Sequence, residues 1–192
     1  MRYGRRLSLD TRELLAAADS IEMPQEGSVY TASEEKFEAL QIAGQISREC
    51  FGGLATQLGY CRGHNRVLNA LEWHSCSEVN VATQPLLLLL GDRRDITPDG
   101  RFSTADVQAF QLQRGEAVEI FATTLHFCPI EIGPQGFGCV VGLCAGTNLP
   151  LTFKPQDRLL FAENKWLIAH EEAAALQKRG AVVGLYGKQL RF

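Results

Sequence analysis

Short apolar runs separated by turn residues dominate the chain from residue 51 onward. Runs such as EVNVA (78–82), PLLLLLGD (85–92) and GFGCVVGLC (136–144) are broken by glycine, asparagine, aspartate or proline roughly every 8 to 14 residues. Strands joined by tight turns produce this rhythm, whereas βαβ units would place helix-length segments between the strands. The pattern therefore predicts an antiparallel β-sandwich or β-barrel.

The first fifty residues have a different pattern. Residues 10–22 have a helical composition, and in residues 33–50 the apolar side chains of Phe37, Ile42 and Ile46 recur at roughly helical spacing. Such spacing places apolar side chains on one face of a helix. We expect two helices there.

The end of the chain predicts one more helix. The segment HEEAAALQKRG (170–180) has helical composition, and His170 is expected at its N-terminal end on the surface. With 192 residues, of which 45% are hydrophobic, the chain can bury one substantial core. We expect a single structural domain, with a helical extension over residues 1–50 packed on a barrel that spans residues 51–192.

Composition and charge exclude several classes of partner. A net charge of -3 argues against nucleic acid or an anionic membrane as a mainly electrostatic partner. The longest apolar run, residues 85–91, is far shorter than a membrane-spanning helix of about 18 residues. The basic N-terminus lacks the apolar core of a signal peptide, and the six cysteines form no CxxC pair. We expect a cytoplasmic protein with reduced thiols.

Candidate chemistry begins in the stretch ALEWHSCSEVNVA (70–82). On a strand, Glu72 and His74 are two residues apart and project from the same face. The polar trio at 75–77 is short enough to turn a hairpin, so that Glu78 would begin the neighbouring strand and return to that face. Three donors to a metal would then converge.

A second segment supplies a fourth donor. Gly115 permits a sharp turn, Glu116 lies on that turn, and the following β-prone run carries His126 back toward the interior. Two carboxylates and two imidazoles would suit a divalent ion such as Zn²⁺, Mn²⁺, Fe²⁺ or Ni²⁺.

These two segments resemble the motifs of the cupin superfamily. Residues 72–78 match the first cupin motif, H-x-H-x(3,4)-E, with Glu72 in place of the first histidine. Gly115-Glu116 and His126 reproduce the spacing of the second motif, although residues 121–123 (FAT) replace its usual P-x-G. The resemblance implies an antiparallel β-barrel or jelly roll, and a metal held by Glu72, His74, Glu78 and His126.

A narrower resemblance covers roughly residues 69–130. In this segment an E-x-H motif is followed by an apolar strand and then by the stretch AFQLQRGEAVEIFATTLHFCPI. This order of motifs is similar to that in the ureidoglycolate lyase branch of the cupins. Phe127 stands where that branch has a second histidine. As a whole the chain looks closest to an uncharacterised bacterial cupin family related to that branch, with GYCRGHN, EWH…SE, TTLHF and ENKW as landmarks.

The resemblance implies a metal-dependent enzyme, a lyase or isomerase, acting on a small polar substrate such as a sugar, a hydroxy acid or a ureido acid. Glu72 or Glu78 would move the proton if it were not a ligand. Two alternatives stay open: a metal-free, ureidoglycolate-lyase-like enzyme and a non-catalytic sugar-binding or regulatory cupin. A homodimer paired through sheet edges is expected.

Three further side chains are candidates for substrate contact. Each also has a purely structural interpretation: Tyr60 as aromatic core packing, His64 as a turn residue, and Lys165 as a solvated lysine in a loop. Lys165 and Asn148 would contact the substrate if their segments closed over the mouth of the barrel.

Overall fold

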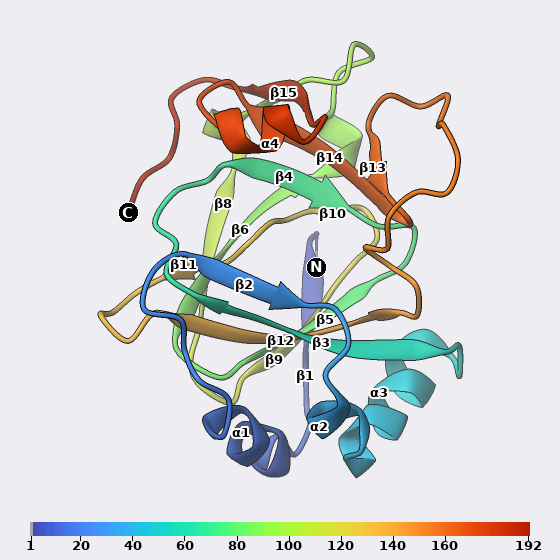
Figure 1. Cartoon of the computed structure of the whole chain (residues 1–192), viewed down its shortest axis with the longest axis vertical. Coiled ribbons are helices and arrows are strands. Elements are labelled where there is room, and N and C mark those ends of the chain that lie inside the picture. The colour runs from blue at the N-terminus through green and yellow to red at the C-terminus, as the bar shows by residue number, and fades with distance from the viewer. Residues whose placement is uncertain (1) are drawn as a thin grey trace.

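The computed structural model describes residues 2–192, and most of its regular elements are β-strands that form curled sheets (Figure 1). The first sheet is antiparallel throughout and has the strand order β1-β9-β5-β12-β3-β2. Its strands are β1 (Gly4–Leu7), β2 (Ser28–Thr31), β3 (Thr56–Gly63), β5 (Glu78–Ala82), β9 (Ala117–Ile120) and β12 (Phe137–Cys144).

The remaining strands form a second layer around β6 and β14. Strand β6 (Leu86–Asp92) pairs with β8 (Gln108–Leu112), β10 (Thr124–Leu125) and β11 (Ile130–Glu131). Strand β14 (Lys165–His170) pairs with β4 (Ala70–Trp73), β13 (Leu160–Ala162) and β15 (Val182–Tyr186), and β15 pairs with β7 (Phe102–Ser103). A bridge between Glu72 and His126 joins the two groups.

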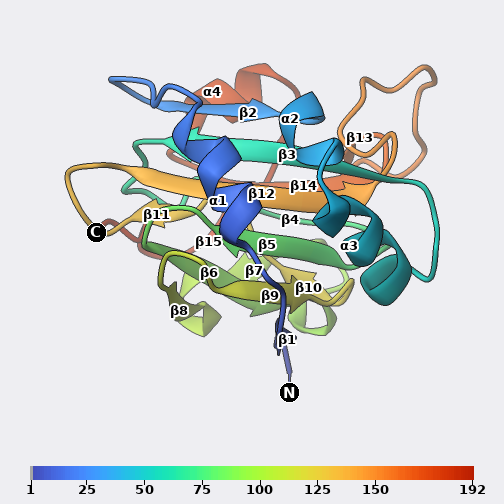
Figure 2. The ribbon, with the colours of Figure 1, turned by 90° about the horizontal axis from the view of Figure 1, so that it is seen from below.

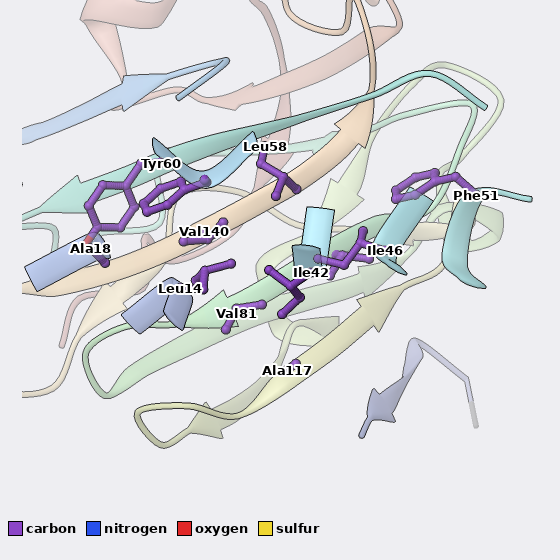
Figure 3. Close-up of a cluster of buried hydrophobic side chains, with 12 residues drawn as sticks. Leu14, Ala18, Ile42, Ile46, Phe51, Leu58, Tyr60, Val81, Ala117 and Val140 are labelled. Atoms are coloured by element: carbon purple, nitrogen blue, oxygen red, sulfur yellow. The ribbon is translucent and has the colours of Figure 1, made fainter. Parts of the chain in front are cut away.

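Three of the helices lie together beside the first sheet (Figures 1 and 2). They are α1 (Arg12–Asp19), α2 (Glu35–Glu38) and α3 (Gln41–Phe51); α4 (Ala174–Lys178) precedes β15, and 3₁₀ turns occupy Arg93–Asp95 and Thr104–Asp106. Figure 3 shows side chains of α1 and α3, including Leu14 and Ile46, gathered with Leu58, Tyr60 and Val140 of the sheet. The helices therefore bury one face of the first sheet.

The other face of the first sheet packs on the second layer. Cys139, Val141 and Leu143 of β12 belong to an apolar cluster with Leu88 and Leu90 of β6. Because successive side chains alternate between faces, Val79 and Val81 of β5 turn toward the helices while Glu78 and Asn80 turn inward. All residues of β5 are buried, since both of its faces are covered.

The predicted fold class is confirmed: the chain is mainly β, with curled sheets in a jelly-roll arrangement, helices near the N-terminus and a short helix near the C-terminus. The helix predicted over residues 33–50 is two helices, because Leu40 between them has an extended backbone. Strand β15 runs parallel to both neighbours, which departs from a purely antiparallel fold.

Two local predictions were wrong. His170 is fully buried at the end of β14 rather than exposed at the start of a helix, because the run KWLIAH pairs with β4 and α4 begins only at Ala174. The trio at 75–77 does not turn a hairpin: β4 pairs with β14, whereas β5 pairs with β9 and β12. It carries the chain from one layer to the other.

The N-terminal fifty residues contribute strands as well as helices. The change of pattern at residue 50 predicts a helical extension over residues 1–50, but β1 and β2 form the two edges of the first sheet. The sequence pattern did not reveal these strands. Within residues 2–192, no helix has both the length and the apolar character needed to cross a membrane.

Candidate metal centre

A cavity of about 490 Å³, lined by both polar and apolar residues, lies between the two layers. Its floor contains the buried side chains of Glu78, Asn80 and His126, and its rim contains the exposed residues Tyr30 and Arg179. A cavity of this size accommodates a small metabolite.

Glu72 and His126 are directly paired across strands. The Glu72 N–H donates to the His126 carbonyl at 2.6 Å, and the His126 N–H donates to the Glu72 carbonyl at 3.0 Å. Residues that exchange both backbone hydrogen bonds point their side chains to the same face. His74, two residues after Glu72, shares that face, and its ring centroid lies 5.2 Å from that of His126.

Both imidazoles are oriented through Nδ1. His74 Nδ1 donates to the Asn164 carbonyl at 2.7 Å, and His126 Nδ1 donates to the Thr124 carbonyl at 3.1 Å. A carbonyl oxygen only accepts, so Nδ1 carries the proton in each ring and Nε2 faces the cluster. This arrangement is the one that metal-binding histidines adopt in proteins.

Glu78 approaches both imidazoles from the opposite layer. Its Oε2 lies 3.2 Å from His126 Nε2 and 3.4 Å from His74 Nε2, while the Asn80 amide donates to its Oε1 at 2.6 Å. Burial alone would raise the pKa of Glu78, but His126 and His74 hold it well below its usual range. Burial alone would lower the pKa of His126, yet Glu78 raises it to about 9.

Glu72 completes the cluster and contacts a lysine. Glu72, His74 and His126 each offer one ligand atom, and these atoms lie within 4.8 Å of one another. Glu72 Oε2 also forms an ion pair with the Lys165 ammonium. The carboxylate is therefore held at the cavity with its charge balanced.

The residues present fit a divalent metal. His74 is 1% exposed, and within residues 2–192 its Nε2 makes no hydrogen bond of good geometry, although Glu78 Oε2 lies 3.4 Å away. Glu72 Oε2 likewise lacks a hydrogen bond of good geometry, although Lys165 balances its charge. Buried polar atoms seldom stay without a partner, and a cation between them would satisfy both. Two imidazoles with carboxylates form a donor set for Zn²⁺, Mn²⁺, Fe²⁺ or Ni²⁺.

Asn164 organises the turn that carries His74. Its backbone is left-handed, with φ of 54°, and its carbonyl accepts from His74. Its side-chain oxygen accepts from the Ser75 N–H at 2.9 Å, and its amide donates to Thr147 Oγ1 at 2.8 Å. One residue thus fixes both the ring of His74 and the backbone that follows it.

The other side chains predicted to contact the substrate do not all lie at the cavity. Lys165 and Asn148 line the cavity. Tyr60 does not: it is 3% exposed in the core beneath the helices, and its hydroxyl lies 2.8 Å from Thr83 Oγ1. His64 is also outside the lining, with Nδ1 2.6 Å from Glu131 Oε2.

Asn80, Tyr30 and Arg179 also line the cavity but were not predicted as site residues. Asn80 could have been predicted from the sequence, because the alternation in EVNVA places it on the same strand face as Glu78. Tyr30 lies on β2, a strand that the pattern did not predict. Arg179 follows α4, and no sequence pattern connects it to the distant metal motifs.

Comparison with known proteins identifies the family. A family model described as "Domain of unknown function (DUF4867)" matches residues 1–190. No curated protein matches the chain. Oxalate decarboxylase from Bacillus subtilis matches at 11% identity and a TM-score of 0.37, over 67% of this chain and 28% of that one.

Two other solved structures match at similar levels. Salicylate 1,2-dioxygenase from Pseudoaminobacter salicylatoxidans, in adducts with gentisate, has 9% identity and a TM-score of 0.35, over 70% of this chain and 30% of that one. Procruciferin, an 11S globulin from Brassica napus, has 11% identity and a TM-score of 0.36, over 78% and 28%. The matched regions span less than a third of these proteins. Because the family model covers nearly all of its residues, the chain belongs to the DUF4867 family.

Proposed function

We propose that this protein is a metal-dependent, cupin-type enzyme that acts on a small polar substrate in the cavity. The observation that carries the proposal is the pair of buried imidazoles, His74 and His126, with Nδ1 bound to backbone carbonyls and Nε2 turned toward two carboxylates. Burying these ionisable groups costs free energy, which favours a functional role over a purely structural one. The set also lines or adjoins the cavity.

Glu72, His74 and His126 would hold the ion, with Glu78 as the fourth donor. A bound divalent ion would supply a Lewis acid that stabilises negative charge on a substrate oxygen, as lyase and isomerase reactions require. Lys165 faces the cavity and, once Glu72 turns to the ion, its ammonium is available to donate a proton to the substrate.

Elemental analysis of the purified protein tests the proposal. We expect about one divalent metal ion per chain in the wild type, as for a single site built from His and carboxylate ligands. His126→Gln should lose the metal. His170→Gln is the matched control, because His170 is equally buried but bonds to the Gly187 carbonyl away from the cluster. Equal metal content in both variants would contradict the assignment.

A second candidate is a metal-free acid/base enzyme similar to ureidoglycolate lyases. The ion pairs Glu78–His126 and Glu72–Lys165 favour it, because they neutralise the buried charges without a cation. This enzyme would act with less than about 0.2 metal per chain, would keep its activity in a chelator, and would lose it on substitution of His126. The metal-dependent enzyme would lose its activity in the chelator.

We also propose a homodimer. Strands β1 and β2 are the edges of the first sheet, and exposed edges are surfaces on which a second copy can pair. Sedimentation analysis tests this, and a monomer at all concentrations would contradict it.

A further inference from the structure

We propose that the substrate is a small hydroxylated carboxylate and that Arg179 binds its carboxylate group. The inference rests on the proposed function in one respect, because it takes the cavity at the metal cluster as the substrate site. It adds to that function the charge of the substrate, and it names Arg179 as the residue that selects for this charge.

The charges that line the cavity leave one cation without a partner. Lys165 is paired with Glu72, and Glu78 contacts the imidazole of His126. Arg179 is the other charged residue of the lining, and it forms no ion pair with any residue between 2 and 192. With neutral imidazoles, the lining's two carboxylates are matched by Lys165 and Arg179. A divalent ion at the cluster would give the lining an excess of positive charge, so the cavity favours an anion.

Arg179 is well placed to receive that anion. It lies at the exposed rim, just after α4, and its guanidinium carbon is 5.6 Å from the centre of the Phe161 ring. Stacking on an aromatic ring restrains a guanidinium while leaving its N–H groups available. A carboxylate matches the spacing of those N–H groups and accepts two parallel hydrogen bonds.

Neutral groups in the same lining suit the rest of such a substrate. The Asn148 amide donates to the Tyr30 hydroxyl at 3.3 Å, which leaves the Tyr30 O–H available as a donor. A tyrosine phenol, with an ordinary pKa of about 10, keeps its proton at neutral pH. Asn80 and Asn69 add further amides to the lining. Amides and a phenol bind hydroxyl groups, while a phosphate dianion would favour a second unpaired cation.

Calorimetric titration with matched probes tests this. We would compare glycerate with glycerol and glycerol 3-phosphate, and gluconate with glucitol and glucose 6-phosphate. At least one carboxylate should bind about tenfold or more tightly than both of its counterparts, as expected for a charge-assisted bidentate contact. Arg179→Gln should remove that advantage. Arg101→Gln is the matched control, because Arg101 also stacks on an aromatic ring, Tyr186, but lies outside the cavity.

Three results would overturn the inference: no carboxylate binds better than its alcohol, a phosphate binds best, or Arg179→Gln binds as the wild type does. Metal content is measured on the same preparations. If carboxylates bind through Arg179 in a protein that never holds metal, the proposed function fails and the inference stands. If the wild type and Arg179→Gln hold metal equally but no carboxylate is preferred, only the inference fails.

Discussion

His126 Nε2 lies 3.2 Å from Glu78 Oε2, although the two residues come from different layers of the fold. His126 follows β10, which pairs with β6, and Glu78 begins β5 in the first sheet. The cluster therefore forms only when the two layers pack together. The site is therefore complete only in the folded protein.

In the proposed metal centre, Lys165 would compete with the ion for Glu72. Lys165→Gln removes the ammonium that pairs with Glu72 Oε2 and also one positive charge from the cavity. We expect the affinity for a divalent ion to rise by about tenfold, because the ion no longer has to displace the Lys165 ammonium from Glu72. Competition with a metal-binding dye measures this affinity.

The control for that measurement is Lys154→Gln, which removes an exposed lysine that does not line the cavity. Its metal affinity should equal that of the wild type. If Lys165→Gln binds metal no more tightly than Lys154→Gln, Glu72 is not a ligand.

Asn164 should support both the fold and the metal. Asn164→Ala places a non-glycine residue without polar atoms at a left-handed φ of 54° and removes the hydrogen bonds to Ser75 and Thr147. We expect a loss of about 2 kcal/mol in the free energy of unfolding and a roughly tenfold loss of metal affinity. Denaturant titration and dye competition measure the two effects.

Asn164→Gly separates the causes. Glycine adopts this φ freely, so Asn164→Gly should be more stable than Asn164→Ala by about 1 kcal/mol. Both variants lose the side-chain contacts and should lose metal affinity alike. Wild-type metal affinity in both would show that the Asn164 side chain does not position His74.

Asp92 should make stability depend on pH in acid. Its carboxylate is 1% exposed and pairs with Arg94 at 2.6 Å and Arg2 at 2.9 Å; these contacts, with Arg94 first, hold its pKa well below the usual range. A depressed pKa stabilises the fold above the unfolded value of about 3.9, and this contribution is lost as pH falls toward the folded value. Asp92→Asn should cost about 1–3 kcal/mol at pH 7.

The cost of Asp92→Asn should shrink steadily below about pH 4, because the wild-type carboxylate becomes protonated in the unfolded chain and then in the folded chain. Denaturant midpoints of both proteins between pH 2 and pH 7 measure the difference. A difference that stays constant across this range would mean that the ion pairs contribute nothing.

Local sequence patterns predicted much of the fold and the centre of the site. The runs EVNVA and 85–92 predicted β5 and β6 because short, mostly apolar runs bounded by turn residues are typical of buried strands. The spacing of Glu72, His74, Glu78 and His126 predicted residues that the structure brings together. Their roles as ligands stay a prediction.

The parts that the sequence did not reveal depend on long-range pairing. Whether the turn at 75–77 makes a hairpin or changes layers is decided by β14, which pairs with β4 from almost one hundred residues away. β1 and β2 are short edge strands without a strong apolar pattern. Arg179 joins the cavity only because α4 packs near it, and Tyr60 leaves it because the helices cover that face.

The most direct test of the metal centre is anomalous diffraction from crystals of the purified protein, recorded on both sides of the absorption edge of the metal found by elemental analysis. We predict one anomalous peak between Glu72, His74 and His126, within coordination distance of both Nε2 atoms. A metal elsewhere, or none at this cluster in protein purified without chelator, would contradict it.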